Sequence, residues 1–155
     1  MFEKILISQC LLGEKVRYDG EAKPLTHALM SLWQQQQRFI GICPEVAGGL
    51  SIPRIPAEIN PQSGNVITQT GENVTNKFHY GARQALDICQ KHHIRFALLK
   101  ESSPSCGSSF IYDGSFSQRK IKGQGITSQL LTKAGVRIFS EHNLEELASL
   151  LDKNE

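Results

Sequence analysis

Short apolar runs alternate along the chain with longer segments in which apolar residues recur at helical spacing. Runs without internal charge are typical of strands buried on both faces, because such strands have no polar side to expose. We expect strands in the runs at residues 4–12, 38–43, 95–100 and 136–140, the first ending near Cys10. Pro44 follows the second run directly and removes a backbone donor there, so it ends that strand.

The segments between these runs carry helical patterns. Pro24 can begin a helix that continues to residue 37, because proline fits the first helical turn. The clearest amphipathic pattern spans residues 73–93, where one face is apolar. Further helices are predicted at 127–134 and 143–152.

Two regions depart from this alternation. Residues 46–69 are rich in glycine and proline and lack helical periodicity, which indicates a long excursion from the core. A hairpin is expected around Asp113–Gly114. The remaining pattern predicts a single α/β domain over residues 1–155, with a mainly parallel sheet and helices on both faces in a Rossmann-like three-layer arrangement.

Composition and charge indicate which binding partners and which cellular compartment to expect. The formal net charge is +2 over 155 residues, which argues against nucleic acid as a partner. The apolar run at the N-terminus is too short for a signal or a membrane span, so we expect a cytoplasmic protein without a membrane partner. In that reducing compartment the four cysteines serve as packing residues, metal ligands or reactive thiols rather than disulfides.

Three of the four cysteines come at or just after a predicted strand: Cys10, Cys43 and Cys106. Open parallel sheets bind ligands outside the carboxyl ends of their strands, so we expect these thiols to converge at that edge. Cys89 instead lies on the apolar face of the helix at 73–93, where a free cysteine packs as a small hydrophobe.

The residues alone leave the chemistry of the three thiols open. They could be small buried side chains, or one of them could be a nucleophile, although no histidine stands in a recognisable pairing context. As metal ligands, three thiolates suit zinc with an open position or an iron–sulfur cluster. The usual zinc spacings, CxxC and HxxxH, are missing from the sequence.

Five segments, taken together and in order, resemble the DUF523 family, which includes thiouracil desulfurases. They are SQCLLGEKVRYDG (8–20), CPEVAGGLSIPRIPAEI (43–59), GENVTNKFHYGARQAL (71–86), LLKESSPSCGSSFIYDG (98–114) and GQGITSQLLTKAGVRIFSE (123–141). The resemblance spans almost the whole chain, and the combined motifs are far more specific than three cysteines.

The resemblance implies a 4Fe-4S cluster held by Cys10, Cys43 and Cys106, with a fourth iron that binds the sulfur of the substrate. The implied reaction is removal of sulfur from 2-thiouracil to give uracil and sulfide. A carboxylate and a serine would assist, and the motifs place them at Glu45 and Ser103. The SPSCG match favours this serine over the neighbouring Ser102.

The substrate implied is a small thiolated base or nucleoside. A planar, partly anionic pyrimidine needs cations, and Arg17, Arg54 and Lys100 stand near the motifs. Ser105 is a further candidate substrate contact in the same loop as Ser103. The alternative to a desulfurase is an iron–sulfur or zinc-binding protein without catalysis.

Overall fold

The central sheet is parallel, as the apolar runs predict. The structure is a computed structural model that describes residues 2–153. Within these residues the order of the strands in this sheet is β2-β1-β5-β8, and all neighbours run parallel. The strands are β1 (Ile5–Ser8), β2 (Phe39–Ile42), β5 (Phe96–Leu98) and β8 (Arg137–Phe139).

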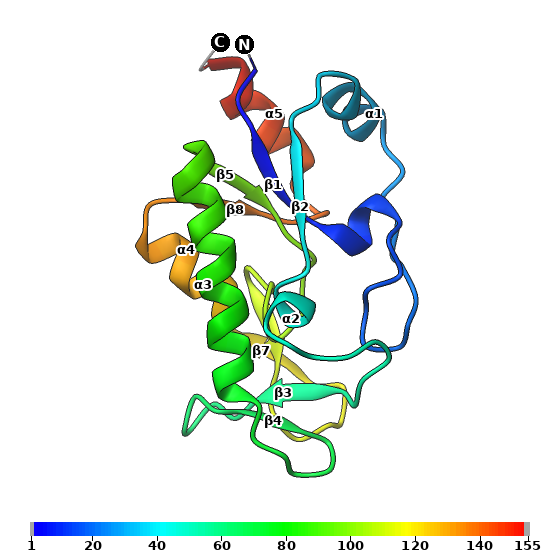
Figure 1. Cartoon of the computed structure of the whole chain (residues 1–155), viewed down its shortest axis with the longest axis vertical. Helices are drawn as coiled ribbons and strands as arrows, with labels where there is room; N and C mark the ends of the chain where they lie inside the picture. The colour runs from blue at the N-terminus through cyan, green and yellow to red at the C-terminus, as the bar shows by residue number, and fades with distance from the viewer. Residues whose placement is uncertain (1, 154–155) are drawn as a thin grey trace.

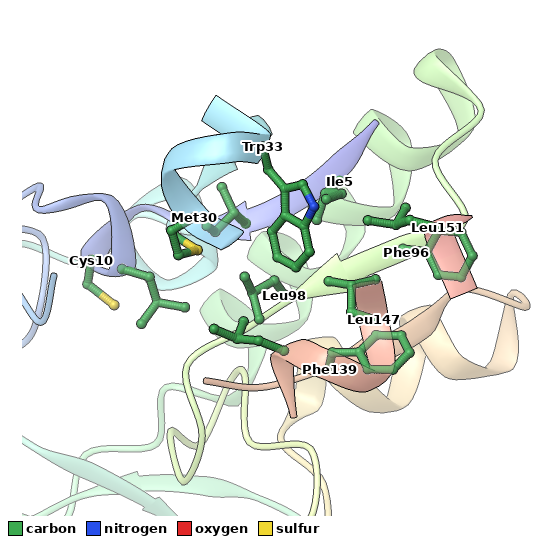
Figure 2. Close-up of a cluster of buried hydrophobic side chains, with 12 residues drawn as sticks. Ile5, Cys10, Met30, Trp33, Phe96, Leu98, Phe139, Leu147 and Leu151 are labelled. Carbon is green, nitrogen blue, oxygen red and sulfur yellow. The ribbon is translucent and has the colours of Figure 1, made fainter. Parts of the chain in front are cut away.

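Side chains at successive positions of a strand point to opposite faces of the sheet, and a helical layer covers each face, which explains why all four residues of β1 are buried. Ile5 and Ile7 face one layer, whereas Leu6 packs with the other. Figure 2 shows the apolar cluster on the first face, the first apolar cluster, to which α1 contributes Trp33 and α5 contributes Leu147. The first layer is α1 (Ala28–Gln35) and α5 (Leu144–Lys153), and the second is α3 (Thr75–His92) and α4 (Ile126–Lys133). The predicted α/β class is thereby confirmed.

Two predicted boundaries were wrong. The first strand ends at Ser8, and Cys10 lies in a 3₁₀ helix, Gln9–Leu12, that follows it. The first helix begins only at Ala28, so Pro24 lies before it and not in its first turn. His27 caps this helix, because its Nδ1 atom accepts the Leu29 N–H.

The excursion at 46–69 contains regular structure that the sequence did not reveal. A hairpin forms there from β3 (Ala57–Ile59) and β4 (Val66–Thr68), and the expected hairpin around Asp113–Gly114 forms from β6 (Phe110–Tyr112) and β7 (Lys120–Lys122). Both lie beyond the carboxyl end of the sheet (Figure 1). A third apolar cluster, which includes Ile59, Phe78 and Ile111, joins them to the second helical layer.

A short helix, α2 (Pro44–Ala47), packs directly on α3. A β-carbon on Gly48 would collide with the Lys77 carbonyl of α3, and one on Gly81 would collide with the Pro44 carbonyl. Only glycine allows this backbone contact, which holds α2 at the end of β2. Among the helices of residues 2–153, none combines the length and apolar character needed to cross a membrane.

Candidate active site

A cavity of about 570 Å³ lies at the carboxyl edge of the sheet. The ends of β1, β2 and β5 form one side of it, and the two hairpins form the other. Cys10, Cys43 and Cys106 all line it, as their places after three strands predict. Figure 2 shows Cys10 at one end of the first apolar cluster, close to Met30.

The three thiols are buried enough to favour their neutral forms. Burial, together with a smaller effect of the neighbouring Cys43, raises the pKa of Cys10 to about 11. Burial also raises the pKa of Cys43 and, most strongly, that of Cys106. A bound metal ion would act in the opposite direction, because its positive charge favours the thiolate forms of its ligands.

Hydrogen-bond donors surround two of these sulfurs. Cys43 directly precedes α2, and hydrogen bonds from the backbone amides of Val46 and Glu45 lower its pKa, opposing the effect of burial. A hydrogen bond from the Ser8 hydroxyl likewise lowers the pKa of Cys106. The Ser8 hydroxyl oxygen accepts the backbone N–H of Lys100 at 3.0 Å. Donors of this kind stabilise thiolates and tune iron–sulfur clusters.

The donor set suits a cluster. Among residues 2–153, no three His, Cys, Asp or Glu side chains are grouped as they would be around one metal ion. The three cysteines nevertheless line the same cavity, and Cys43 contributes to the raised pKa of both Cys10 and Cys106. Three soft sulfur donors on one cavity wall are the ligand type that iron–sulfur clusters take, so the residues present fit such a group.

Glu45 and Ser103 meet in the cavity. The Ser103 hydroxyl donates to Oε2 of Glu45 at 3.3 Å. The same hydroxyl oxygen accepts the backbone N–H groups of Ser105 and Cys106, each at 3.1 Å. These two amides fix the oxygen and leave its proton for the carboxylate, so the two predicted catalytic side chains form one hydrogen-bonded pair.

Arg54 lies on the other side of the carboxylate. Its Nε donates to Oε1 of Glu45 at 3.2 Å, and its side chain is only 7% exposed. Its Nη1 donates to the carbonyls of Val16 and Ser51, both at 3.1 Å. The guanidinium thus donates to three protein oxygens, and Arg54 also lines the cavity.

The other two predicted cations also line the cavity and also have acidic partners. Arg17 is more exposed and pairs with Asp19 at 3.2 Å. The Nζ atom of Lys100 lies 2.6 Å from Oε2 of Glu141.

Ser105 is the predicted substrate contact that the structure keeps away from the cavity within the described residues. Its side chain is fully buried, and its hydroxyl shares a 2.7 Å hydrogen bond with that of Thr127 in α4. It joins the cysteine loop to α4 instead. Ser102, the alternative to Ser103, does line the cavity. Cys89 is buried in the apolar cluster that packs α3 and α4 on the second face of the sheet, as expected for packing.

Glu101 is a site residue that the sequence analysis missed. Its carboxylate accepts backbone N–H groups from four residues of the following loop and the Ser108 hydroxyl, at 2.6 to 3.2 Å. Although burial raises it, these hydrogen bonds bring the pKa of Glu101 below its usual range. The carboxylate thus holds together the loop that carries Ser103 and Cys106. No sequence signal distinguishes it from a surface glutamate.

The hairpins supply the wall opposite the cysteines, which was also missed. Tyr112 and Lys120 are cross-strand partners on β6 and β7, with Nζ 5.6 Å from the ring centre. Phe116 lines the cavity from the connecting loop in a left-handed conformation, φ 57°. Glu58 of β3 secures that loop by accepting the N–H groups of Gly114 and Phe116.

Comparison with known proteins identifies the family. A model of the 2-thiouracil desulfurase family matches residues 5–143. The chain belongs to the 2-thiouracil desulfurase family. A solved structure of a protein described as the 4Fe-4S-dependent thiouracil desulfidase TudS (DUF523Vcz) superposes with a TM-score of 0.93 at 48% identity, covering 97% of this chain and 98% of that one. The uncharacterized protein YbbK of Bacillus subtilis (strain 168) is 39% identical over 154 residues, which is 92% of this chain and 99% of YbbK.

Proposed function

We propose that this protein is an iron–sulfur-dependent desulfurase that converts a thiolated pyrimidine such as 2-thiouracil, with water, into uracil and sulfide. Membership of the 2-thiouracil desulfurase family and likeness to a 4Fe-4S-dependent desulfidase support the cofactor and the reaction class. The observation that carries the proposal for this chain is the Ser103–Glu45 hydrogen bond inside a cavity lined by three cysteines.

In this proposal Cys10, Cys43 and Cys106 hold the cluster. When bound, a 4Fe-4S cluster with three protein ligands supplies an iron with an open position, a Lewis acid suited to the soft thiocarbonyl sulfur. The surrounding donors, Ser8 and the amides at the start of α2, favour the thiolate form of the ligands.

The protein residues move the protons. Water adds to the thiocarbonyl carbon and the C–S bond then breaks, so that an exocyclic oxygen replaces the sulfur and the two hydrogens of the water leave with it as hydrogen sulfide. Glu45 takes a proton from the attacking water at Oε2, and general-base help of this kind contributes about 10²–10⁴-fold. Ser103 donates to the same oxygen in the resting site, so it orients the carboxylate and can pass the proton onward.

The substrate is a free base or a nucleoside in this proposal. Tyr112 and Phe116 offer aromatic faces on the wall opposite the cysteines, where a planar ring can stack. Arg17 and Lys100 place positive charge at the same cavity, and their carboxylate partners leave donors available for a second oxygen.

Activity of the anaerobically loaded protein tests the proposal. Protein with bound iron is mixed with 2-thiouracil, and sulfide and uracil are measured together. We expect equal amounts of both from the wild type, and at least a hundredfold less from Glu45→Gln, with an unchanged iron content, as about 10²–10⁴-fold general-base help requires. Iron-loaded protein that releases no sulfide, or a colourless protein that takes up only zinc, would contradict the proposal.

A cluster carrier would release no sulfide in this assay. With an acceptor apoprotein added in place of 2-thiouracil, it would transfer its cluster, and Glu45→Gln would transfer the cluster as well as the wild type does.

A further inference from the structure

Arg54 was expected to bind substrate, yet its contacts suggest another task. The residue is held at both ends. Its backbone N–H donates to the Tyr18 carbonyl at 2.7 Å, and its Nη1 is shared between the Val16 and Ser51 carbonyls. A side chain fixed in this way and 7% exposed cannot turn toward a ligand without giving up several hydrogen bonds.

The Arg54 side chain also contacts Glu45, the carboxylate that acts as the base in the proposed function. Nε of Arg54 bonds Oε1 of Glu45, while Ser103 bonds Oε2. The carboxylate is thus held from two sides, with one oxygen taken by the guanidinium and the other turned toward the serine. The planar fork of arginine suits this role, because its donors have fixed directions.

We propose that Arg54 is a positioning residue that acts through Glu45, holding the carboxylate so that Oε2 faces Ser103 and the attacking water. The inference rests on the proposed function. A residue of this kind affects the chemical step and leaves substrate affinity alone, whereas a substrate-binding arginine does the reverse. The two roles therefore separate in kinetics and in binding.

Four variants of the cluster-loaded enzyme test it: Arg54→Gln, Arg54→Lys, Glu45→Gln and the double variant Glu45→Gln/Arg54→Gln. Misplacement of a catalytic group by about 1 Å can cost about 10²-fold, so we expect Arg54→Gln to lower kcat by about 10–100-fold. KM should stay within about twofold of wild type. Arg54→Lys should recover part of kcat, because lysine keeps the charge but not the fork.

The double variant decides whether Arg54 works through Glu45. Residues that act as a unit are strongly non-additive, so we expect the double variant to be no more than about twofold slower than Glu45→Gln alone. If the fold-losses in kcat of the two single variants multiply in the double variant, the inference is overturned. The exposed Arg83, which pairs with Asp87 on α3, gives the matched control Arg83→Gln with unchanged kinetics.

Binding without turnover gives a second readout. Equilibrium dialysis of 2-thiouracil against iron-loaded Glu45→Gln and the double variant should give equal dissociation constants. A tenfold weaker constant in the double variant, on the order of the loss when one hydrogen bond to a charged group is removed, would show direct substrate contact and overturn the inference.

Iron content is measured for every variant. If Arg54→Gln does not bind iron, the kinetics of iron-loaded Arg54→Lys test the inference instead. A raised KM with a normal kcat in that variant would overturn it. Failure of the proposed function is distinguishable, because then the loaded wild type itself releases no sulfide.

Discussion

Removal of the Glu101 carboxylate should destabilise the fold more than any ordinary surface change. Glu101 is 8% exposed, and its carboxylate accepts hydrogen bonds from four backbone N–H groups and one hydroxyl. Each hydrogen bond to a charged acceptor is worth about 1.5–3 kcal/mol, and an unsatisfied buried donor costs about 1–3 kcal/mol. Water can reach part of the opened loop, so we expect Glu101→Ala to cost about 3–5 kcal/mol rather than the full sum.

Glu101→Gln separates charge from shape. The amide oxygen can still accept the backbone N–H groups, so the loss should be smaller, about 1–2 kcal/mol. Urea unfolding followed by circular dichroism measures both variants against wild type in the same cluster state. The exposed Glu72→Ala is the control and should stay within about 0.5 kcal/mol of wild type. A Glu101→Ala protein within about 1 kcal/mol of wild type would refute the reasoning.

Three further expectations follow from the same geometry. The pKa of Glu101 is lower in the folded protein than its value of about 4.5 in the unfolded chain, so its carboxylate stabilises the fold above pH 4.5 and loses this effect as pH falls through the folded-state pKa. The difference in unfolding free energy between wild type and Glu101→Gln should therefore shrink when urea unfolding is repeated at decreasing pH. A difference that grows would contradict this. Gly48→Ala should lower the free energy of unfolding by about 1–3 kcal/mol and reduce activity, because the added β-carbon collides with α3 and displaces α2. Unfolding and sulfide assays check this, with the exposed Ser149→Ala as the control. Gly64→Ala is unsuitable as a control because Gly64 has a positive φ. Cys89→Ala should cost about 1 kcal/mol in unfolding while iron content stays at the wild-type level, and loss of iron would contradict its packing role.

The parallel sheet and the meeting of the cysteines could be predicted from the sequence. An apolar run without charge signals burial on both faces, and strands that run parallel end at one edge, so the residues that follow them come together. These inferences need only local patterns and a topological rule. Cys10, Cys43 and Cys106 line one cavity for that reason.

The hairpins and the partners of single side chains could not be predicted. Strands of three residues, such as β3 and β4, are too short for an alternation to stand out, and tertiary contacts stabilise them. Ser103 comes just before the turn at residues 104–106 and lies at the cavity, whereas Ser105, within that turn, bonds Thr127 of α4; composition does not encode this difference in direction. The Arg54–Glu45 pair arises from where the excursion folds back, which is a non-local event.

Oxygen-18 water tests the central claim most directly. Iron-loaded protein turns over 2-thiouracil in labelled water, and mass spectrometry of uracil is combined with a sulfide measurement. Hydrolytic desulfuration assisted by Glu45 predicts one oxygen-18 atom in each uracil formed and one sulfide released for each uracil. Iron-loaded protein that yields unlabelled uracil, or that yields no sulfide, would contradict the account.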